Sequence, residues 1–195
     1  MKRFDLAPFV FLIVVAIASI GFGQSSIREI DAYAKKLDSL SRLHKSAAIT
    51  AADVSDYRTK SSDDWRVFKT QAAFRSYTKK NEVYTTADNW KQNGKIVKSE
   101  FGYSSPSGDW SQSVDNYFRP DGSLAKAASE MRTFVNDCVI KKNFYYDAIG
   151  NLISKTAKYF DVRTNRPKKP CEAMNSGDVT YYTSASKLPF AKLMP

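Results

Sequence analysis

The chain has 195 residues and a net charge of +10, and 13% of its residues are aromatic. This aromatic content argues against disorder, and the length suits one domain with a real hydrophobic core. The charge favours acidic partners, namely acidic envelope polysaccharide, anionic lipid or acidic protein. The sequence predicts no cofactor.

Residues 1–23 have the composition of an export signal. Two basic residues precede an apolar run over residues 9–20, which is shorter than the ~20 residues that a membrane-spanning helix needs. We expect cleavage near Gly23, with residues 16–18 as the alternative cut and a retained anchor as the alternative fate. Cleavage removes two basic and one acidic residue, which leaves a charge of +9. The protein is then periplasmic or extracellular, which argues against nucleic acid as a partner.

Residues 24–195 are expected to form a single α+β domain. Residues 25–45 are predicted to be a helix whose apolar stripe, at spacings of three and four, packs on a sheet. A membrane-surface helix is the alternative, although its polar face carries both signs of charge. Residues 46–64 are interpreted as a polar connection, and residues 61–79 as either a second helix or an irregular strand. The stripe consists of Ile30, Ala34, Leu37 and Leu40.

Three glycines recur at a spacing of 28 residues: Gly94, Gly122 and Gly150. Each has an aromatic residue four positions before it and a branched aliphatic residue two positions after it, as in an internal repeat. The segment at residues 119–122, Arg-Pro-Asp-Gly, suits a type I turn that ends in a left-handed glycine. We therefore expect three hairpins, each with a three-residue loop and a glycine bulge, and the glycines as turn scaffold.

These hairpins predict six antiparallel strands in a meander over residues 82–162, with the N-terminal helix on one face and the other face left for water or a partner. The residue pairs beside the loops are aromatic–aliphatic and favourable. They are Trp90 with Ile96, Phe118 with Leu124, and Tyr146 with Leu152. Extending the same register pairs Asp88 with Lys98, Asn116 with Lys126, Val114 with Ala128, and Tyr145 with Ile153.

The two cysteines, Cys138 and Cys171, predict a disulfide in an oxidising compartment, with two free thiols as the alternative. Closing this loop of roughly 30 residues contributes about 3 kcal/mol. The bond would tie the tail, residues 163–195, to the sheet. In that tail, residues 179–182 are expected to form a short strand, and residues 188–190 and Leu193 to dock as an apolar clasp.

A frame of two aromatics, three other residues, glycine, one residue and leucine occurs twice, as YFRPDGSL at 117–124 and YYDAIGNL at 145–152. It resembles exported bacterial proteins built of repeated β-hairpins, in the style of the MORN-like and YD-repeat groups. The resemblance covers residues 88–160. It implies an antiparallel hairpin scaffold used for surface contact, generally without catalysis, and it transfers no site residue.

Signatures of catalysis are scarce. His44 is the only histidine, and we place it near the end of the first helix, where a cation favours the helix dipole. One histidine and two cysteines lack the spacing of a metal site. A carboxylate pair for glycoside hydrolysis is an alternative, although the same acids suit exposed positions paired with lysine. The acids concerned are Asp88, Glu100, Asp115 and Glu130.

Aromatic and basic residues alternate around residues 141–146 and 155–160, as they do in stacking platforms for sugars or bases. The alternative is an ordinary alternating strand with one core face. The candidate contact surface comprises Tyr145, Tyr159, Lys141 and Lys158.

We therefore expect a non-catalytic exported binding or interaction protein of the cell envelope or extracellular space. The first alternative is a periplasmic carrier that holds an apolar ligand between a curved sheet and the helix. The second is a small glycan-active hydrolase, which requires two acids to converge in a cleft.

Overall fold

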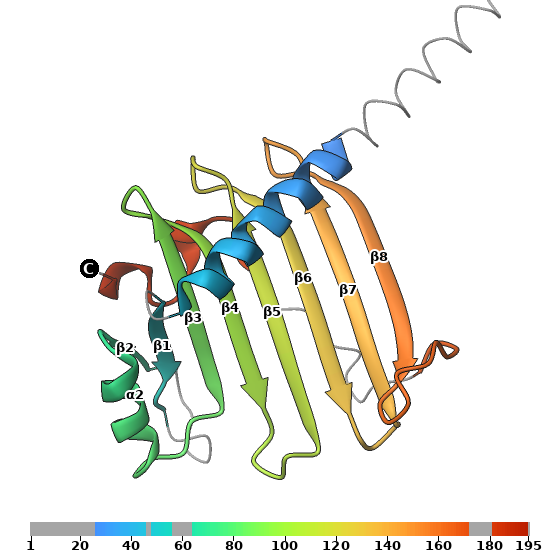
Figure 1. Ribbon diagram of the computed structural model, residues 1–195, viewed down its shortest axis with the longest axis horizontal. Coiled ribbons are helices and arrows are strands. Elements are labelled where there is room, and N and C mark those ends of the chain that lie inside the picture. The colour runs from blue at the N-terminus through green and yellow to red at the C-terminus, as the bar shows by residue number, and fades with distance from the viewer. Residues whose placement is uncertain (1–25, 46–47, 56–63, 172–180, 195) are drawn as a thin grey trace, which may run out of the picture.

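The computed structural model describes residues 26–45, 48–55, 64–171 and 181–194, and shows an α+β fold with two helices and one antiparallel sheet of eight strands (Figure 1). The expected export signal lies outside these residues. No helix in the described ranges has the length and apolar character to cross a membrane. The N-terminal helix covers residues 26–43, and the other elements are β1 (Ile49–Asp53), β2 (Trp65–Phe68), α2 (Gln71–Thr78), β3 (Thr85–Gln92), β4 (Lys95–Ser104), β5 (Trp110–Phe118), β6 (Leu124–Thr133), β7 (Cys138–Tyr146), β8 (Leu152–Asp161), and the 3₁₀ turns η2 (Ala185–Lys187) and η3 (Ala191–Leu193).

The strand order is β2-β1-β3-β4-β5-β6-β7-β8, so the expected number of six strands is wrong. Strands β3 to β8 are the expected meander, and β1 and β2 extend it beyond β3. Strand β1 has the sequence ITAAD, in which small residues hide the usual β-branched and aromatic signature. Residues 61–79 contain both of the expected alternatives, because strand β2 precedes helix α2. The Thr70 hydroxyl caps α2 by accepting a hydrogen bond from the Ala73 N–H.

The N-terminal helix crosses one face of the sheet diagonally (Figure 1), and we call this side the helix face. Its predicted apolar stripe is confirmed, because Ile30, Ala34 and Leu37 are all buried against the sheet. Ile30 packs with Ala125 and Tyr145, whereas Ala34 and Leu37 pack with Val97 and Tyr117. The apolar stripe is therefore buried between the helix and the sheet.

A row of alternating aromatics and lysines lies beneath this helix, one residue on each of five adjacent strands. In order across the sheet it is Trp90, Lys98, Tyr117, Lys126 and Tyr145. Each ammonium lies 5.1–6.0 Å from the centroids of its two neighbouring rings, within the range of cation–π attraction.

Two aspartates of the helix pair with these lysines. Asp31 lies 2.7 Å from Lys126, and Asp38 lies 3.0 Å from Lys98. Their separation of seven residues is close to two helical turns, so both carboxylates point to the sheet. The helix is thus fixed in position by ion pairs as well as by apolar contacts.

The opposite face, which we call the back face, carries the main core and is covered by residues 181–194 (Figure 1). Phe190 is fully buried there, 5.0 Å from the ring centroid of Trp65, and Leu188 is 3% exposed. The expected clasp is therefore right for residues 188–190 and wrong for Leu193, which is 53% exposed. The part of the back face that carries this core is consequently not left to water or a partner, whereas Lys155 and Ala157 on β8 are exposed there.

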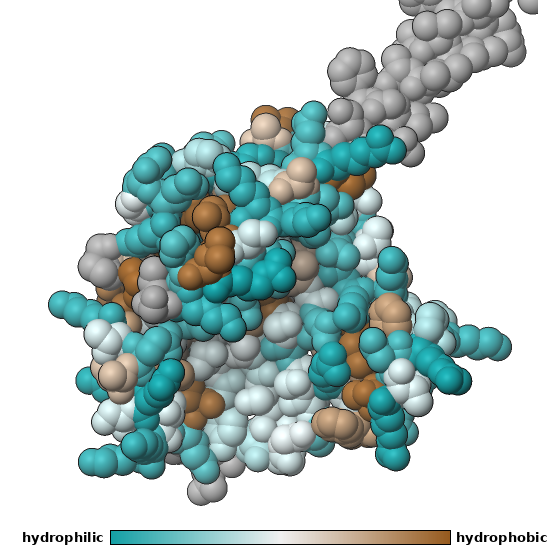
Figure 2. Space-filling model, in the orientation of Figure 1, coloured by the Kyte–Doolittle hydropathy of each residue, from teal (hydrophilic) through white to brown (hydrophobic). Residues whose placement is uncertain are grey.

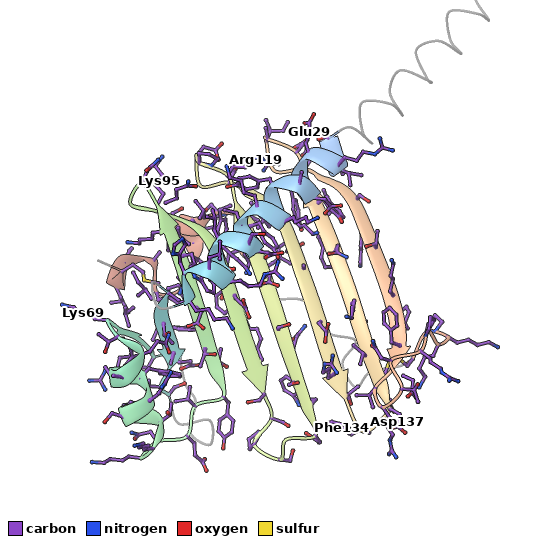
Figure 3. All side chains as sticks on the ribbon, viewed as in Figure 1. Glu29, Lys69, Lys95, Arg119, Phe134 and Asp137 are labelled. Carbon is purple, nitrogen blue, oxygen red and sulfur yellow. A yellow bond between two sulfur atoms is a disulfide. The ribbon has the colours of Figure 1, made fainter. Side chains whose placement is uncertain are left out.

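The loops that contain Gly122 and Gly150 have the expected geometry. Both glycines have positive φ, and each N–H donates to the carbonyl three residues earlier. Phe118 lies opposite Leu124, and Tyr146 lies opposite Leu152, as predicted. These loops and the β3–β4 loop share the end of the sheet at which Lys95 and Arg119 are labelled in Figure 3.

The first hairpin differs because its loop has two residues, Asn93 and Gly94, both with positive φ. Such a loop is the preferred short hairpin turn for an Asn-Gly pair. It places Lys91 opposite Ile96, so the predicted pairing of Trp90 with Ile96 is wrong. Trp90 lies opposite Lys98 instead.

The predicted register beyond the loops is also wrong, because each hairpin contains a bulge with one additional residue. Each bulge displaces the more distant pairs by one residue, and the two-residue loop displaces those of the first hairpin by one more. The observed partners are Glu100 for Asp88, Ala127 for Asn116, Ser129 for Val114, and Ser154 for Tyr145.

The disulfide between Cys138 and Cys171 is present, with 6.6 Å between the two Cα atoms. Ahead of Cys171 the chain folds back along β8, where the Lys168 N–H donates to the Tyr159 carbonyl. The start of the tail is thus held at β7 and β8. Of the expected strand at residues 179–182, the first two lie outside the described residues, and Tyr181 and Tyr182 are not in a strand.

Candidate functional site

An open cavity of about 760 Å³ lies on the helix face, between the N-terminal helix, α2 and strands β3 to β5. This face of the molecule is hollowed below the helix (Figure 2). The cavity has the volume of a small-molecule site. It is lined by Asp38, Ser41, Arg42, Lys45, Gln71, Arg75, Asp88, Trp90, Lys98, Glu100 and Asp115.

Three acidic residues form the floor, one on each of three adjacent strands. Asp88 on β3 lies directly opposite Glu100 on β4, which in turn lies directly opposite Asp115 on β5. Residues in such positions have Cβ atoms about 5 Å apart, and like charges there are destabilising. The observed register therefore creates an arrangement that opposes folding.

Lys98 is the only lysine on this floor and is itself buried, with 6% of its side chain exposed. Its Nζ lies 3.0 Å from Asp38, 3.3 Å from Asp115 and 3.4 Å from Glu100. Burial acts to lower the pKa of this ammonium, but the three carboxylates outweigh burial and raise the pKa above its usual value. Lys98 is therefore a permanent cation that holds the acids together.

The floor is nevertheless not fully neutralised. Burial raises the pKa of the Asp115 carboxyl to about 6, because the nearby charge of Lys98 only partly opposes burial and Glu100 adds repulsion. Burial, assisted by Asp115 and Asp38, also raises the pKa of the Tyr117 hydroxyl. One lysine thus does not balance the acids around it.

A chain of hydrogen bonds joins the floor to α2. The Thr50 hydroxyl donates to Asp88 over 2.6 Å, and Gln71 donates through Nε2 to the Thr50 oxygen over 2.7 Å. Gln71 is the first residue of α2, and Arg75 follows it one turn later at the cavity edge. This wall is therefore built by strand β1, which was not predicted from the sequence, and by helix α2, which was one of two alternatives for residues 61–79.

Trp90 forms an aromatic part of the wall below the end of the N-terminal helix. Its Nε1 donates to the His44 carbonyl over 3.4 Å, and its ring lies 5.3 Å from the Lys98 ammonium. His44 is exposed just after the helix, close to where the sequence places it. A side cavity of about 210 Å³ adjoins Trp90 and is lined partly by Leu37 and Val97.

The structure does not bring the four residues of the expected contact surface together. Tyr145 is buried under the helix, and its hydroxyl donates to Asp31. Tyr159 faces the other side of the sheet, in contact with Ile140. Lys141 and Lys158 lie opposite each other on the helix face, and Lys141 pairs with Glu130 over 2.8 Å.

The strand acids named in the hydrolase alternative are divided. Asp88, Glu100 and Asp115 meet in the cavity, whereas Glu130 lies outside it, between Arg132 and Lys141. Within the described residues, no group of three or more His, Cys, Asp or Glu side chains is arranged to hold a metal ion.

Sequence reasoning missed Asp38, Gln71, Trp90 and Lys98 as site residues. One signal was present, since Lys98 follows Gly94 and Lys126 follows Gly122 by four residues, and both lysines lie in the same row, on either side of Tyr117. Pairing Asp88 with Glu100 requires both the two-residue loop and the bulge of the first hairpin, a shift of two residues from the predicted partner Lys98.

The chain matches no protein-family model, no curated protein and no solved structure.

Proposed function

We propose that this chain is an exported, non-catalytic binding protein, and that the cavity under its N-terminal helix binds a polar ligand. The observation that carries the proposal is the row of Asp88, Glu100 and Asp115. A scaffold gains nothing from three like charges on adjacent strands. Features that oppose stability and shift pKa values are concentrated at functional sites.

The character of the walls favours a polar ligand over an apolar one. Acids, bases and amides make up most of the lining, and Trp90 is the one aromatic residue among the lining side chains. The large aromatic side chains that an apolar carrier would need, such as Phe101 and Phe118, are used in the core of the back face. An apolar cargo would have to displace water from charged groups at a large cost.

The ion pairs of Lys98 favour binding over catalysis. A carboxylate acts as a nucleophile or base only when its charge is available to the substrate. Asp38, Glu100 and Asp115 all lie within 3.4 Å of the same ammonium. Their charges are thereby held in fixed positions, which suits recognition.

The test is capture from cell-envelope extract by residues 24–195, followed by mass spectrometry. Glu100→Gln and Asp88→Asn should each abolish specific capture, because they remove charge from the floor without removing volume. Glu130→Gln is the matched control, since Glu130 is an acid on the same face outside the cavity. Capture that survives both floor substitutions would contradict the proposal.

A small glycan-active hydrolase is the second candidate, and one observation favours it. Glu100 lies opposite Asp115, whose pKa is raised to about 6. Retaining glycosidases use two carboxyls about 5 Å apart, one of them protonated at neutral pH. This candidate requires new reducing ends to appear from envelope glycans with the parent chain but not with Asp115→Asn, and no release by the parent would rule it out.

A further inference from the structure

We infer that the ligand of this cavity carries an ammonium group and a separate anionic group, the ammonium on the acidic floor and the anion at the basic rim. The inference rests on the proposed function, since it names the class of ligand for the same site. Its basis is the separation of charge within one cavity: three of the four lining acids are on strands, and three of the four lining cations are on the two flanking helices or just after one of them.

The floor has more negative than positive charge. Asp38, Asp88, Glu100 and Asp115 line the cavity, whereas Lys98 is the only cation among the lining residues of the strands. The Thr50 hydroxyl stabilises Asp88 through a hydrogen bond without neutralising it. Burial is the main cause of the raised pKa of the Asp115 carboxyl; the charge of Lys98 opposes it, and Glu100 and Asp38 add repulsion.

A second cation would relieve the floor. Glu100 is available for it, because 48% of its side chain is exposed despite its contact with Lys98. An ammonium can donate three hydrogen bonds, which suits a floor of several carboxylates. The half-buried ring of Trp90 already faces one ammonium and offers a second favourable surface for a cation.

The rim has the opposite charge. Arg42 and Lys45 come from the N-terminal helix and its end, Arg75 comes from α2, and all three are exposed side chains that line the same cavity. Within the described part of the chain, no ion pair joins any of these three to an acid. Arginine forms paired hydrogen bonds with phosphate or carboxylate, so this rim suits an anionic group.

A ligand with only one charge would leave half of the site unused. A ligand with only a positive charge would be attracted by the acidic floor but repelled by the basic rim. A ligand with only a negative charge would be attracted by the rim but repelled by the floor. A ligand with both charges satisfies both regions at once, and a volume of about 760 Å³ accommodates one of monosaccharide size.

Four probes that share one sugar ring separate the two charges: glucosamine 6-phosphate, glucosamine, glucose 6-phosphate and glucose. Each is titrated into residues 24–195 at low ionic strength and followed by calorimetry and amide NMR. We expect glucosamine 6-phosphate to bind about ten-fold or more tightly than either singly charged probe, a difference of about 1.4 kcal/mol. Glucose should bind most weakly.

Variants assign each charge to its region. Glu100→Gln should weaken glucosamine and glucosamine 6-phosphate but leave glucose 6-phosphate unchanged or improved. Arg75→Gln should weaken the two phosphates and leave glucosamine unchanged. Glu130→Gln is the control outside the cavity and should alter none of the four affinities.

The inference is overturned if the four probes bind equally or if none binds. It is also overturned if neither Glu100→Gln nor Arg75→Gln changes the relative affinities of the probes. These outcomes are distinct from failure of the proposed function, which depends on capture from envelope extract. Capture that needs Glu100, together with probes that show no charge preference, would leave the binding site intact and refute only this ligand class.

Discussion

Single residues that line the cavity lower the stability of the folded state at neutral pH, and Asp115 is the clearest case. Burial raises its pKa to about 6 from the ordinary 3.8, so the folded state binds this proton more tightly than the unfolded chain does. The stability that this site contributes is therefore complete below about pH 3.8 and is lost as the pH rises through about 6.

We predict that Asp115→Asn, which stays neutral at every pH, has the parent's stability near pH 4. At pH 8 it should be more stable than the parent by about 1–3 kcal/mol, because it avoids the buried charge. Urea unfolding at both pH values measures the difference. A variant that is less stable than the parent at pH 8 would show that the pairing of Asp115 with Lys98 outweighs burial.

Glu130 provides a control of opposite sign. Burial acts to raise its pKa, but Lys141 and Arg132 outweigh burial and lower the pKa below its ordinary value. The stability that it contributes is present at neutral pH and is lost as the pH falls through the lowered pKa. Glu130→Gln should therefore lose stability at pH 8 and approach the parent at strongly acidic pH.

A second cost at the residue scale is a row of polar side chains on the back face. Asn89, Ser99 and Asn116 lie opposite one another on β3, β4 and β5, and all three are fully buried. Both amide atoms of Asn116 lack a hydrogen-bond partner among the described residues. A buried polar atom without a partner costs about 1–3 kcal/mol.

Replacing Asn116 with leucine, which has a similar shape and no polar atoms, should therefore raise the free energy of unfolding by about 1 kcal/mol or more. Val114→Ala serves as the comparison and should lower it, because Val114 is fully buried on the same strand and its truncation opens a cavity. Denaturant unfolding measures both. A destabilised leucine variant would mean that the amide of Asn116 is satisfied by a buried water.

At the scale of elements, the N-terminal helix and residues 181–194 are held on the sheet by different kinds of contact. The N-terminal helix combines a buried stripe with two ion pairs, which fixes its diagonal position over the cavity. The C-terminal residues instead insert apolar side chains into the core of the back face. The helix thus shapes the site, and the C-terminal segment supports the floor from behind.

This difference predicts unequal effects within the C-terminal segment. Phe190→Ala should lower the free energy of unfolding by about 3–5 kcal/mol, because the ring is fully buried against Trp65 and Phe101. Leu193→Ala, three residues later and 53% exposed, should change it by less than about 0.5 kcal/mol. Thermal or denaturant unfolding compares them, and equal losses would show that the segment docks differently.

For the whole molecule, the disulfide is the covalent cross-link that ties the tail to the sheet, in addition to the backbone that continues from β8. Cys138 and Cys171 are 33 residues apart, so the bond restricts a loop of moderate length in the unfolded chain. The double variant Cys138→Ala with Cys171→Ala should lose about 3 kcal/mol in denaturant unfolding.

Chemical reduction of the parent is the matched control, because it breaks the bond and keeps both sulfur atoms. Reduction and the double variant should cost similar free energies of unfolding. Stability that does not change on reduction would contradict a structural role for the bond.

Local chemistry in the sequence was enough to predict several parts of this fold. The stripe of Ile30, Ala34 and Leu37 depends on helical period alone, and the loops at Gly122 and Gly150 depend on residues three positions apart. The pairs beside those loops followed from the same short-range rules. Such features are determined by interactions between residues close in sequence.

The eight-stranded sheet, the register beyond the bulges and the cavity were decided by tertiary structure. The two-residue loop and the bulge of the first hairpin each move the later partners by one residue, which is why Asp88 meets Glu100 and not Lys98. Strand β1 and helix α2 carry weak local preferences. Strand β1 forms by pairing with β3, and α2 packs against β1 and β2, so that Gln71 reaches Thr50 beside the floor. The site depends on contacts between segments far apart in the chain, because only the folded sheet places those side chains side by side.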